Sequence, residues 1–387
     1  MRALLAVLGT IFVSLMGFGI IIPILPKYAQ ERGATQWEVG VIFASFSIAQ
    51  MLASPYLGGL SDRIGRRPVL VFSMFGSVAS FAILALATSM PLVLLSRVVD
   101  GLSAASVVTA RAYIADLLAE HERAKGYGMM GAAFGLGFIA GPAIGGQLAR
   151  IGPTAPAWGA AGLSLIAMIL AWLYVSETQH ASQARGPNPL RHAPGMLGRP
   201  ILGRILFVNL LVWSCFAVYH STFPEFGMKQ FGFKEWHLGN ILALVGGTAV
   251  VTQLYIMPRL VKLYGERSCI AGGLAVCALG LVGAATTRDS NLFIAMAVPI
   301  TVGGAFASPC LTSLLSQTAG KHEMGLVQGV ANSLESLGRI IGPLWGYMIM
   351  AKGISLAWLS AGLVMVGVAA FALTMKPAAN TIEATGV

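Results

Sequence analysis

Charged residues are scarce in this sequence. Only 10% of its 387 residues are charged and 56% are hydrophobic, whereas a soluble domain carries about 25% charged residues. So few ions could not cover the surface of a water-soluble enzyme of this size. The 25 basic residues outnumber the 15 acidic ones, but they are scattered singly between apolar stretches, so nucleic acid is not an expected partner. The composition indicates a protein that crosses a membrane many times.

Cysteine is also rare, and each of the four cysteines lies in an apolar run with no CxxC spacing between any two. Such cysteines behave as small buried hydrophobes, so neither a disulfide framework nor a metal site is expected. The sequence also has no phosphate-binding loop and no nucleophile with a neighbouring base. We therefore expect a protein that is not an enzyme and that holds no cofactor. The four residues are Cys215, Cys269, Cys277 and Cys310.

Long apolar stretches fill most of the chain. A bilayer core of about 30 Å needs about 20 apolar helical residues, and irregular backbone cannot face lipid. The expected fold class is therefore an all-α membrane protein. Charged or turn-forming breaks divide the sequence into twelve predicted transmembrane helices at 4–26, 39–60, 68–88, 91–113, 127–149, 155–176, 203–223, 238–258, 269–287, 292–316, 325–350 and 354–375.

One break, at residues 177–202, is longer than the others and separates six spans from six. The predicted organisation is an N-terminal six-helix bundle at 1–176, a cytoplasmic linker at 177–202, a C-terminal six-helix bundle at 203–376 and a cytoplasmic tail at 377–387. More Lys and Arg residues fall in loops on the side of the two termini. The positive-inside rule therefore predicts a multi-pass protein with both termini cytoplasmic.

The two halves resemble each other at a displacement of about 200 residues. Two parallel six-helix repeats around a central cavity near the membrane midplane are typical of an alternating-access transporter. This is the predicted architecture. The matching positions are Pro23 and Pro224, Trp37-x-x-Gly40 and Trp236-x-x-Gly239, Gly65 and Gly265, and Gly141-Pro142-x-x-Gly145 and Gly342-Pro343-x-x-Gly346.

The break between the second and third spans, residues 58–68, reads GGLSDRIGRRP. Its cations satisfy the cytoplasmic bias and could bind anionic headgroups, but this does not explain the acid Asp62. A carboxylate there can lie at a helix N-terminus or pair with an arginine. Such contacts could form a latch that breaks in each transport cycle. The latch residues are Gly59, Asp62, Arg63, Gly65, Arg66 and Arg67, with Arg111 and Asp116 near the end of the fourth span.

This segment resembles the signature loop of the major facilitator superfamily, G-x-L-x-D-R-x-G-R-R. Arg97-x-x-x-Gly101 is similar to the fourth-span motif of that superfamily, and Ala112-Tyr113-Ile114-Ala115-Asp116 is similar to the corresponding junction of bacterial tetracycline-type exporters. Gly137-x-x-x-Gly141-Pro142-x-x-Gly145-Gly146 resembles the fifth-span motif of the drug:proton antiporter branch. The resemblance implies the major facilitator fold, protons as the coupling ion, and multidrug efflux with antibiotic resistance at the bacterial inner membrane.

The glycines of the fifth span also have a physical interpretation. Gly137, Gly141 and Gly145 recur at four-residue spacing and form a smooth stripe that another helix can approach closely. Pro142 leaves a carbonyl unpaired and bends the helix. A close, kinked contact suits the seam between the two halves. The alternative is ordinary packing of membrane helices, and the two interpretations are compatible.

Four ionisable residues within predicted spans are candidates for coupling. Charges there are costly and imply a partner or a wet cavity. Arg97 and Asp100 are three residues apart, and Glu335 and Arg339 are four apart, so each pair shares a helix face. We favour Glu335 and Asp100 as protonatable groups, with Arg97 and Arg339 tuning them or meeting an anionic substrate. The alternative is two self-neutralised pairs that fix helix rotation.

One position departs from the family. Tetracycline-type exporters carry an acid in the first span, where alignment through Gly17-x-Gly19 gives Ser14 here. The resemblance therefore leaves both tetracycline as a substrate and the usual coupling group open. The remaining polar candidates for the cavity, each of which could instead form an interhelical hydrogen bond, are Gln50, Asn209, Tyr219, Gln253 and Asn332.

The favoured function is proton-coupled antiport that exports amphiphilic or drug-like molecules by alternating access. The expected partners are a small-molecule substrate and membrane lipids, and the protein is expected to be a monomer. Two alternatives stay open. One is a symporter or facilitator for a polar or anionic metabolite, anchored by Arg97 and Arg339. The other is a lipid-handling transporter.

Overall fold

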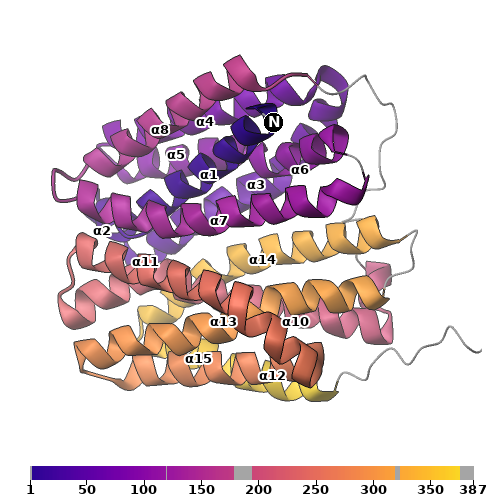
Figure 1. Cartoon of the computed structure of the whole chain (residues 1–387). Coiled ribbons are helices and arrows are strands. Elements are labelled where there is room, and N and C mark those ends of the chain that lie inside the picture. The colour runs from indigo at the N-terminus through magenta and orange to yellow at the C-terminus, as the bar shows by residue number, and fades with distance from the viewer. Residues whose placement is uncertain (1, 119, 178–193, 319–322, 375–387) are drawn as a thin grey trace, which may run out of the picture. The chain divides into compact units, whose positions relative to one another are not determined.

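A computed structural model of the chain describes residues 2–118, 120–177, 194–318 and 323–374, and in these residues all regular structure is helical (Figure 1). The first half contains the short α2 and seven longer helices. Their bounds are α1 Arg2–Ile21, α2 Leu25–Gln30, α3 Gln36–Ile64, α4 Arg66–Leu86, α5 Met90–Ser103, α6 Ser106–Leu117, α7 Glu120–Leu148 and α8 Ala155–Tyr174.

The second half is built in the same way from longer helices. Their bounds are α10 Pro200–Phe231, α11 Glu235–Val251, a π-helical turn at Thr252–Ile256, α12 Met257–Thr286, α13 Ser290–Thr318, α14 Met324–Met350 and α15 Leu356–Thr374. Most of the predicted linker and the predicted tail at 377–387 lie outside the described residues.

The helices agree with twelve membrane crossings. Ten described stretches are long and apolar enough to span a bilayer, and one of them, Glu235–Thr286, has 52 residues. That is enough for two crossings of about 20 residues each, and Gly265 inside it has a non-helical backbone with φ of 76°. The amphipathic α14, with 27 residues, adds the remaining span.

The fourth span differs from the prediction. A single helix at 91–113 was expected, but the structure has two helices, α5 and α6, separated at Ala104 and Ala105. A break inside a membrane needs other partners for the freed backbone groups. Ser73 of α4 supplies them: its Oγ accepts hydrogen bonds from the backbone N–H groups of Ala105 (3.2 Å) and Ser106 (3.1 Å), and it donates to the carbonyl of Ser103.

Two other predicted boundaries also differ from those in the structure. The first predicted span, 4–26, ends as α1 at Ile21, and α2 follows after a turn. Pro23 and Pro26 lie at this point, and a proline interrupts the backbone hydrogen bonds of a helix. The predicted loop at 58–68 is almost wholly helical, because α3 runs to Ile64 and α4 begins at Arg66. Only Gly65, with φ of 104°, breaks the helix there.

The chain packs into two compact units. Unit 1 comprises Met1–Arg185 and His220–Gly247, and unit 2 comprises Gly186–Tyr219 and Thr248–Val387. In unit 1, α1 packs against α7 and α8, and α4 packs against α5 and α8. In unit 2, α12 packs against α13 and α15. The predicted division into bundles at 1–176 and 203–376 remains a prediction.

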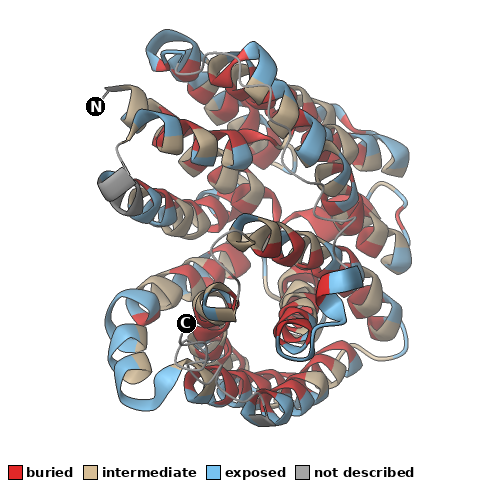
Figure 2. Cartoon of the chain, turned by 90° about the vertical axis from the view of Figure 1, so that its right-hand side faces the viewer, coloured by how far each residue is buried: buried red, intermediate tan, exposed pale blue. Residues whose placement is uncertain are grey.

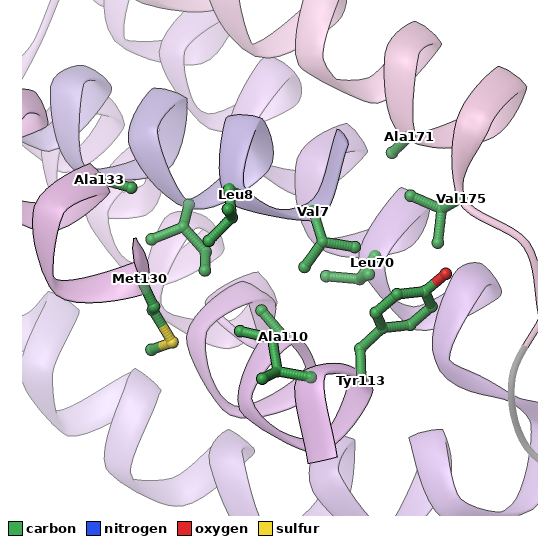
Figure 3. Packing of buried hydrophobic residues seen from close by; sticks show 11 residues of the cluster. Val7, Leu8, Leu70, Ala110, Tyr113, Met130, Ala133, Ala171 and Val175 are labelled. Atoms are coloured by element: carbon green, nitrogen blue, oxygen red, sulfur yellow. The ribbon is translucent and has the colours of Figure 1, made fainter. Parts of the chain in front are cut away.

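The core of unit 1 consists of small and branched apolar side chains. Figure 3 shows one cluster, in which Val7 and Leu8 of α1 lie near Leu70 of α4 and Tyr113 of α6. The same cluster includes Ala171 of α8, and small residues let the helices approach closely. This packing holds α1, α4, α6 and α8 together beside the latch residues.

The outer faces of the helices are apolar as well. Buried residues lie where helices of a unit face one another, and exposed ones on the opposite sides (Figure 2). Large hydrophobic side chains are exposed on α8 and α15, among them Ile166, Leu173, Leu363 and Val366. So many exposed apolar side chains are unfavourable in water and suit contact with lipid. The chain is a multi-pass membrane protein.

Candidate functional site

Arg66 is the centre of the predicted latch. It begins α4 and is buried, although it carries a charge. Its guanidinium donates to Asp116 Oδ2 of α6 (2.9 Å), to Ser61 Oγ (2.7 Å) and to Asp62 Oδ1 of α3. Paired carboxylates offset the cost of burying an arginine. Arg66 thus ties the ends of α3, α4 and α6 together, as the latch prediction requires of Asp62, Arg66 and Asp116.

Glu177 is part of this cluster and was not predicted. Its carboxylate accepts hydrogen bonds from the backbone N–H groups of Arg66 (2.7 Å) and Arg67 (3.2 Å) at the start of α4. An acid there satisfies otherwise unpaired donors and the positive end of the helix dipole. A Cβ atom on Gly65 would lie 2.2 Å from Glu177 Oε2. Gly65 is therefore required both by its positive φ and by the space that Glu177 occupies.

The other predicted latch residues are not joined to Arg66. Arg67 donates to the carbonyl of Trp172 and lies 5.1 Å from the centre of its ring, so it fastens α4 to α8. Arg63 and Arg111 are exposed. Gly59 lies within α3 with open space beside it. Exposed cations at this end of the helices fit the charge bias that suggested a cytoplasmic face.

Arg97 and Asp100 form a sealed ion pair within α5. Their side chains are 3% and 8% exposed, and Arg97 Nη1 lies 3.2 Å from Asp100 Oδ2. Serine hydroxyls surround the pair. Ser77 donates to Asp100 Oδ1 (3.3 Å), and Arg97 donates to Ser80 (3.2 Å) and Ser96 (3.3 Å). The geometry is that of the self-neutralised pair weighed as the alternative to a coupling site.

A small cavity of about 20 Å³ adjoins Arg97. This is space for about one water molecule. Aromatic residues Phe18, Phe43 and Phe46 line it with Ile21 and other aliphatic residues. Arg97 is its one charged lining residue, so the cavity provides the pair with little water.

Glu335 and Arg339 lie together in α14, in unit 2. Both are half-buried. Arg339 donates to Ser336 Oγ (3.0 Å), and its guanidinium lies 5.4 Å from the centre of the Trp213 ring of α10. A cation over an indole face is a favourable contact. Glu335 is thus less enclosed than Asp100, and the two acids lie in different units.

The predicted polar cavity residues differ in their burial and in their contacts. Asn209 is buried and donates to the carbonyl of Ala331 (3.3 Å), so it links α10 to α14. Tyr219 is also buried, with its ring centre 5.2 Å from that of Trp358. Gln253 and Asn332 are exposed, and Gln50 is half-buried in unit 1. Asn209 matches the interhelical alternative, and the other roles remain predictions.

The glycine stripe of α7 packs mainly within the first half. Added Cβ atoms on Gly137, Gly141 and Gly145 would lie 2.9, 2.6 and 2.2 Å from the carbonyl oxygens of Phe12, Met16 and Ile20 of α1. Ordinary helix packing within the first half therefore accounts for these three glycines. They match the packing alternative, since α1 has only a glycine, Gly19, opposite Gly141 and Pro142.

The last glycine of the motif faces a different helix. A Cβ atom on Gly146 would lie 2.9 Å from Trp236 Cα of α11, and one on Gly239 would lie 2.3 Å from the carbonyl of Pro142. The second half repeats the first contact, because Cβ atoms on Gly338 and Gly342 of α14 would meet the backbone of α10. Each glycine-rich helix thus lies against the first helix of its own half.

Two further ion pairs lie outside the spanning segments. Lys27 Nζ of α2 is 2.6 Å from Glu235 Oε1 of α11, and the hydrogen bond to Glu235 raises the pKa of Lys27 against the opposing effect of burial. In unit 2, Arg199 binds both oxygens of Glu323 at 2.7 and 3.0 Å. This bidentate pair lowers the pKa of Glu323 and raises that of Arg199. It fastens the start of α10 to the start of α14.

The sequence matches the model of the Major Facilitator Superfamily over residues 7–343, which is most of its length. The chain belongs to the Major Facilitator Superfamily. Its relatives in this superfamily include the class C tetracycline resistance protein of Escherichia coli, which is 32% identical over 92% of this chain and 93% of that protein. Multidrug resistance protein 2 of Bacillus subtilis (strain 168) is 29% identical over 93% of this chain and 91% of that protein.

Solved structures of the superfamily share this fold. The crystal structure of the human organic anion transporter MFSD10 (TETRAN) covers 96% of this chain with a TM-score of 0.72, and the alignment covers 99% of that chain. Sequence identity to it is 22%, so the likeness concerns the fold alone.

Ser14 marks where this member departs from the tetracycline-type pattern. Its Oγ donates to the carbonyl of Thr10 (2.8 Å) and to Ser106 Oγ at the start of α6 (3.1 Å). Ser106 in turn donates its backbone N–H to Ser73. Ser14 therefore joins α1 to the hydrogen bonds that support the break in the fourth span. This contact could not be predicted from the sequence, because it depends on where the fourth span breaks.

Proposed function

We propose that this protein exports amphiphilic or drug-like molecules in exchange for protons by alternating access. One observation carries the proposal: identity of about 30% over nearly the whole chain to tetracycline and multidrug resistance proteins. The substrate class comes from those relatives. The latch around Arg66 and the paired glycine contacts of α7 and α14 supply tied helix ends and close helix contacts that suit a rocking mechanism.

Glu335 is the proton-binding group of this proposal. An acid that exchanges protons with water must be reached by water, and Glu335 is half-buried whereas the Asp100 side chain is 8% exposed and lies against Arg97. Burial favours the neutral form of a carboxyl group and a nearby arginine favours the charged form. Arg339, one turn along α14, supplies this second effect. Asp100 is the second candidate, and it would need to leave its pair with Arg97.

We propose a plasma-membrane transporter, at the bacterial inner membrane, with both termini and the Arg66 latch on the cytoplasmic side. The exposed cations Arg63 and Arg111 near the latch support this orientation. The protein works as a monomer without a metal or organic cofactor, the proton being its coupling ion.

Transport in proteoliposomes tests the function. With purified protein and an imposed pH gradient, ethidium should move against its own gradient, and Glu335→Gln should abolish this movement because glutamine carries no exchangeable carboxyl proton. Exchange of ethidium without a pH gradient should survive in the same variant. Glu31→Gln is the matched control and should transport normally, because Glu31 lies directly after α2 and its side chain is 48% exposed.

The outcomes separate the alternatives. Movement of ethidium in the same direction as the proton would contradict antiport and favour a symporter. Transport of a fluorescent phospholipid without dependence on the gradient would favour lipid handling. Gradient-driven transport that persists in Glu335→Gln but is lost in Asp100→Asn would move the coupling role to Asp100.

A further inference from the structure

Glu225 is a buried acid that neither the sequence motifs nor the proposed transport mechanism uses. It lies near the end of α10, directly after Pro224, and is 1% exposed. Its Oε1 accepts a hydrogen bond from Gln30 Nε2 of α2 at 2.9 Å and lies 2.5 Å from Lys229 Nζ, one turn along α10. One oxygen of this carboxylate therefore joins α10 to α2.

The other oxygen has no such partner. Glu225 Oε2 is shielded from solvent, and no described residue donates a hydrogen bond to it. A buried carboxylate oxygen without a donor loses its hydration and gains nothing in exchange. Protonation at Oε2 removes that cost, since the neutral carboxyl group is far less strongly hydrated. Oε2 is therefore the oxygen of this carboxylate at which a proton can bind.

Charges of both signs surround this end of unit 1. Lys229 is 46% exposed, so its ammonium can return to water when its pairing with Glu225 weakens. Lys27 of α2 is already paired with Glu235 of α11 at 2.6 Å and does not neutralise Glu225. The other titratable groups on the neighbouring elements are Tyr28 of α2, Glu31 directly after it, Lys234 before α11 and His237 within it.

We propose that Glu225 is a second proton-binding site, which controls the attachment of Lys229 beside the junction of α2 and α10. A proton from water adds to Oε2 and converts the carboxylate to a neutral carboxyl group. No covalent bond breaks. The ion pair with Lys229 is lost, whereas Gln30 can still donate to Oε1. The use of this proton in transport rests on the proposed antiport, but the binding of the proton does not.

Infrared difference spectroscopy of the purified full-length protein tests the site. Lowering the pH should produce a protonated-carboxyl band in the wild type, and Glu225→Gln should lose that component. Glu31→Gln should keep it, because Glu31 is open to water and has no enclosed oxygen. Lys229→Met should change the pH at which the band appears, since it removes the ammonium group that pairs with Oε1.

The same band in Glu225→Gln and the wild type would overturn the proposal. An unchanged pH of appearance in Lys229→Met would also overturn it, and this variant leaves the buried acid in place should Glu225→Gln fold poorly. Proton-driven ethidium transport is measured separately. A wild-type protein that shows the band but no proton-driven transport would refute the proposed antiport and leave the proton site standing.

Discussion

At the scale of single residues, the hydroxyl of Ser73 supplies hydrogen bonds to the backbone where the helix of the fourth span is interrupted. It accepts from the N–H groups of Ala105 and Ser106 and donates to the carbonyl of Ser103. Ser73→Ala should leave the buried N–H group of Ser106 without its acceptor, at a cost of about 1–3 kcal/mol, whereas Ala105 still donates to the carbonyl of Ser103. We expect a lower melting temperature in detergent, measured by tryptophan fluorescence.

Ser45→Ala is the control for this prediction. Ser45 is also buried, but its Oγ donates only to the carbonyl of Ile42 in its own helix. That carbonyl belongs to a helix and keeps its backbone partner, so the melting temperature should change little. Equal losses of stability in the two variants would show that the break in the fourth span does not depend on Ser73.

Some site residues could be predicted from the sequence and others could not. Asp62, Arg66 and Asp116 were found because an acid among arginines at a tight break needs a partner, and the partners were present nearby or in a familiar motif. Glu177 lies 111 residues from Arg66, and Glu225 lies 195 residues from Gln30. A contact over such a separation depends on which helices become neighbours, which hydropathy does not specify.

At the scale of helices, the contact of α7 with α1 permits no side chain at Gly145. A Cβ atom there would lie 2.2 Å from the carbonyl oxygen of Ile20. Gly145→Ala should push the two helices apart at a cost of about 1–3 kcal/mol or more. We expect less folded protein after size-exclusion chromatography and a lower melting temperature.

Gly131→Ala in the same helix provides the comparison. Nothing lies within 4 Å of a Cβ atom at Gly131, and alanine favours helix over glycine by about 1 kcal/mol. This variant should fold as well as the wild type. A wild-type melting temperature for Gly145→Ala would mean that α1 and α7 do not pack as closely as the structure shows.

Hydropathy located the spans but not their interruptions. Hydropathy depends only on the types of the side chains. The residues around Ala104 and Ala105 therefore have the same hydropathy whether the span is one helix or two. The hydrogen bonds of the backbone decide the difference, and part of them are made to Ser73 on another helix. For the same reason, the π-helical turn at Thr252–Ile256 was not distinguished within the predicted span 238–258. The helical residues before Gly265 were predicted as a loop between that span and the next one, 269–287.

At the scale of the whole molecule, the salt bridge between Arg199 and Glu323 predicts a dependence of stability on pH. The pKa of Glu323 is lowered from its ordinary value of 4.5. Its contribution to stability is therefore complete above pH 4.5 and disappears as the pH falls through the lowered value. In Glu323→Gln, this part of the acid-induced fall in melting temperature should be absent.

A second acid variant controls for general effects of low pH. Glu31→Gln changes an exposed acid in unit 1, so its melting temperature should fall with acid as in the wild type. Because both partners of the salt bridge are exposed, the effect should shrink at high salt. An identical acid profile for Glu323→Gln and the wild type would show that the pair does not stabilise unit 2.

The broken fourth span also has a consequence for biosynthesis. Met90–Leu117 is apolar enough to partition into lipid as one segment, yet at its centre the N–H group of Ser106 donates to Ser73 of the preceding helix. The segment therefore cannot reach its mature shape as an isolated helix beside the translocon. The ribosome makes α4 before α5 and α6, and α4 must stay beside them during insertion. The third and fourth spans therefore assemble as a single unit.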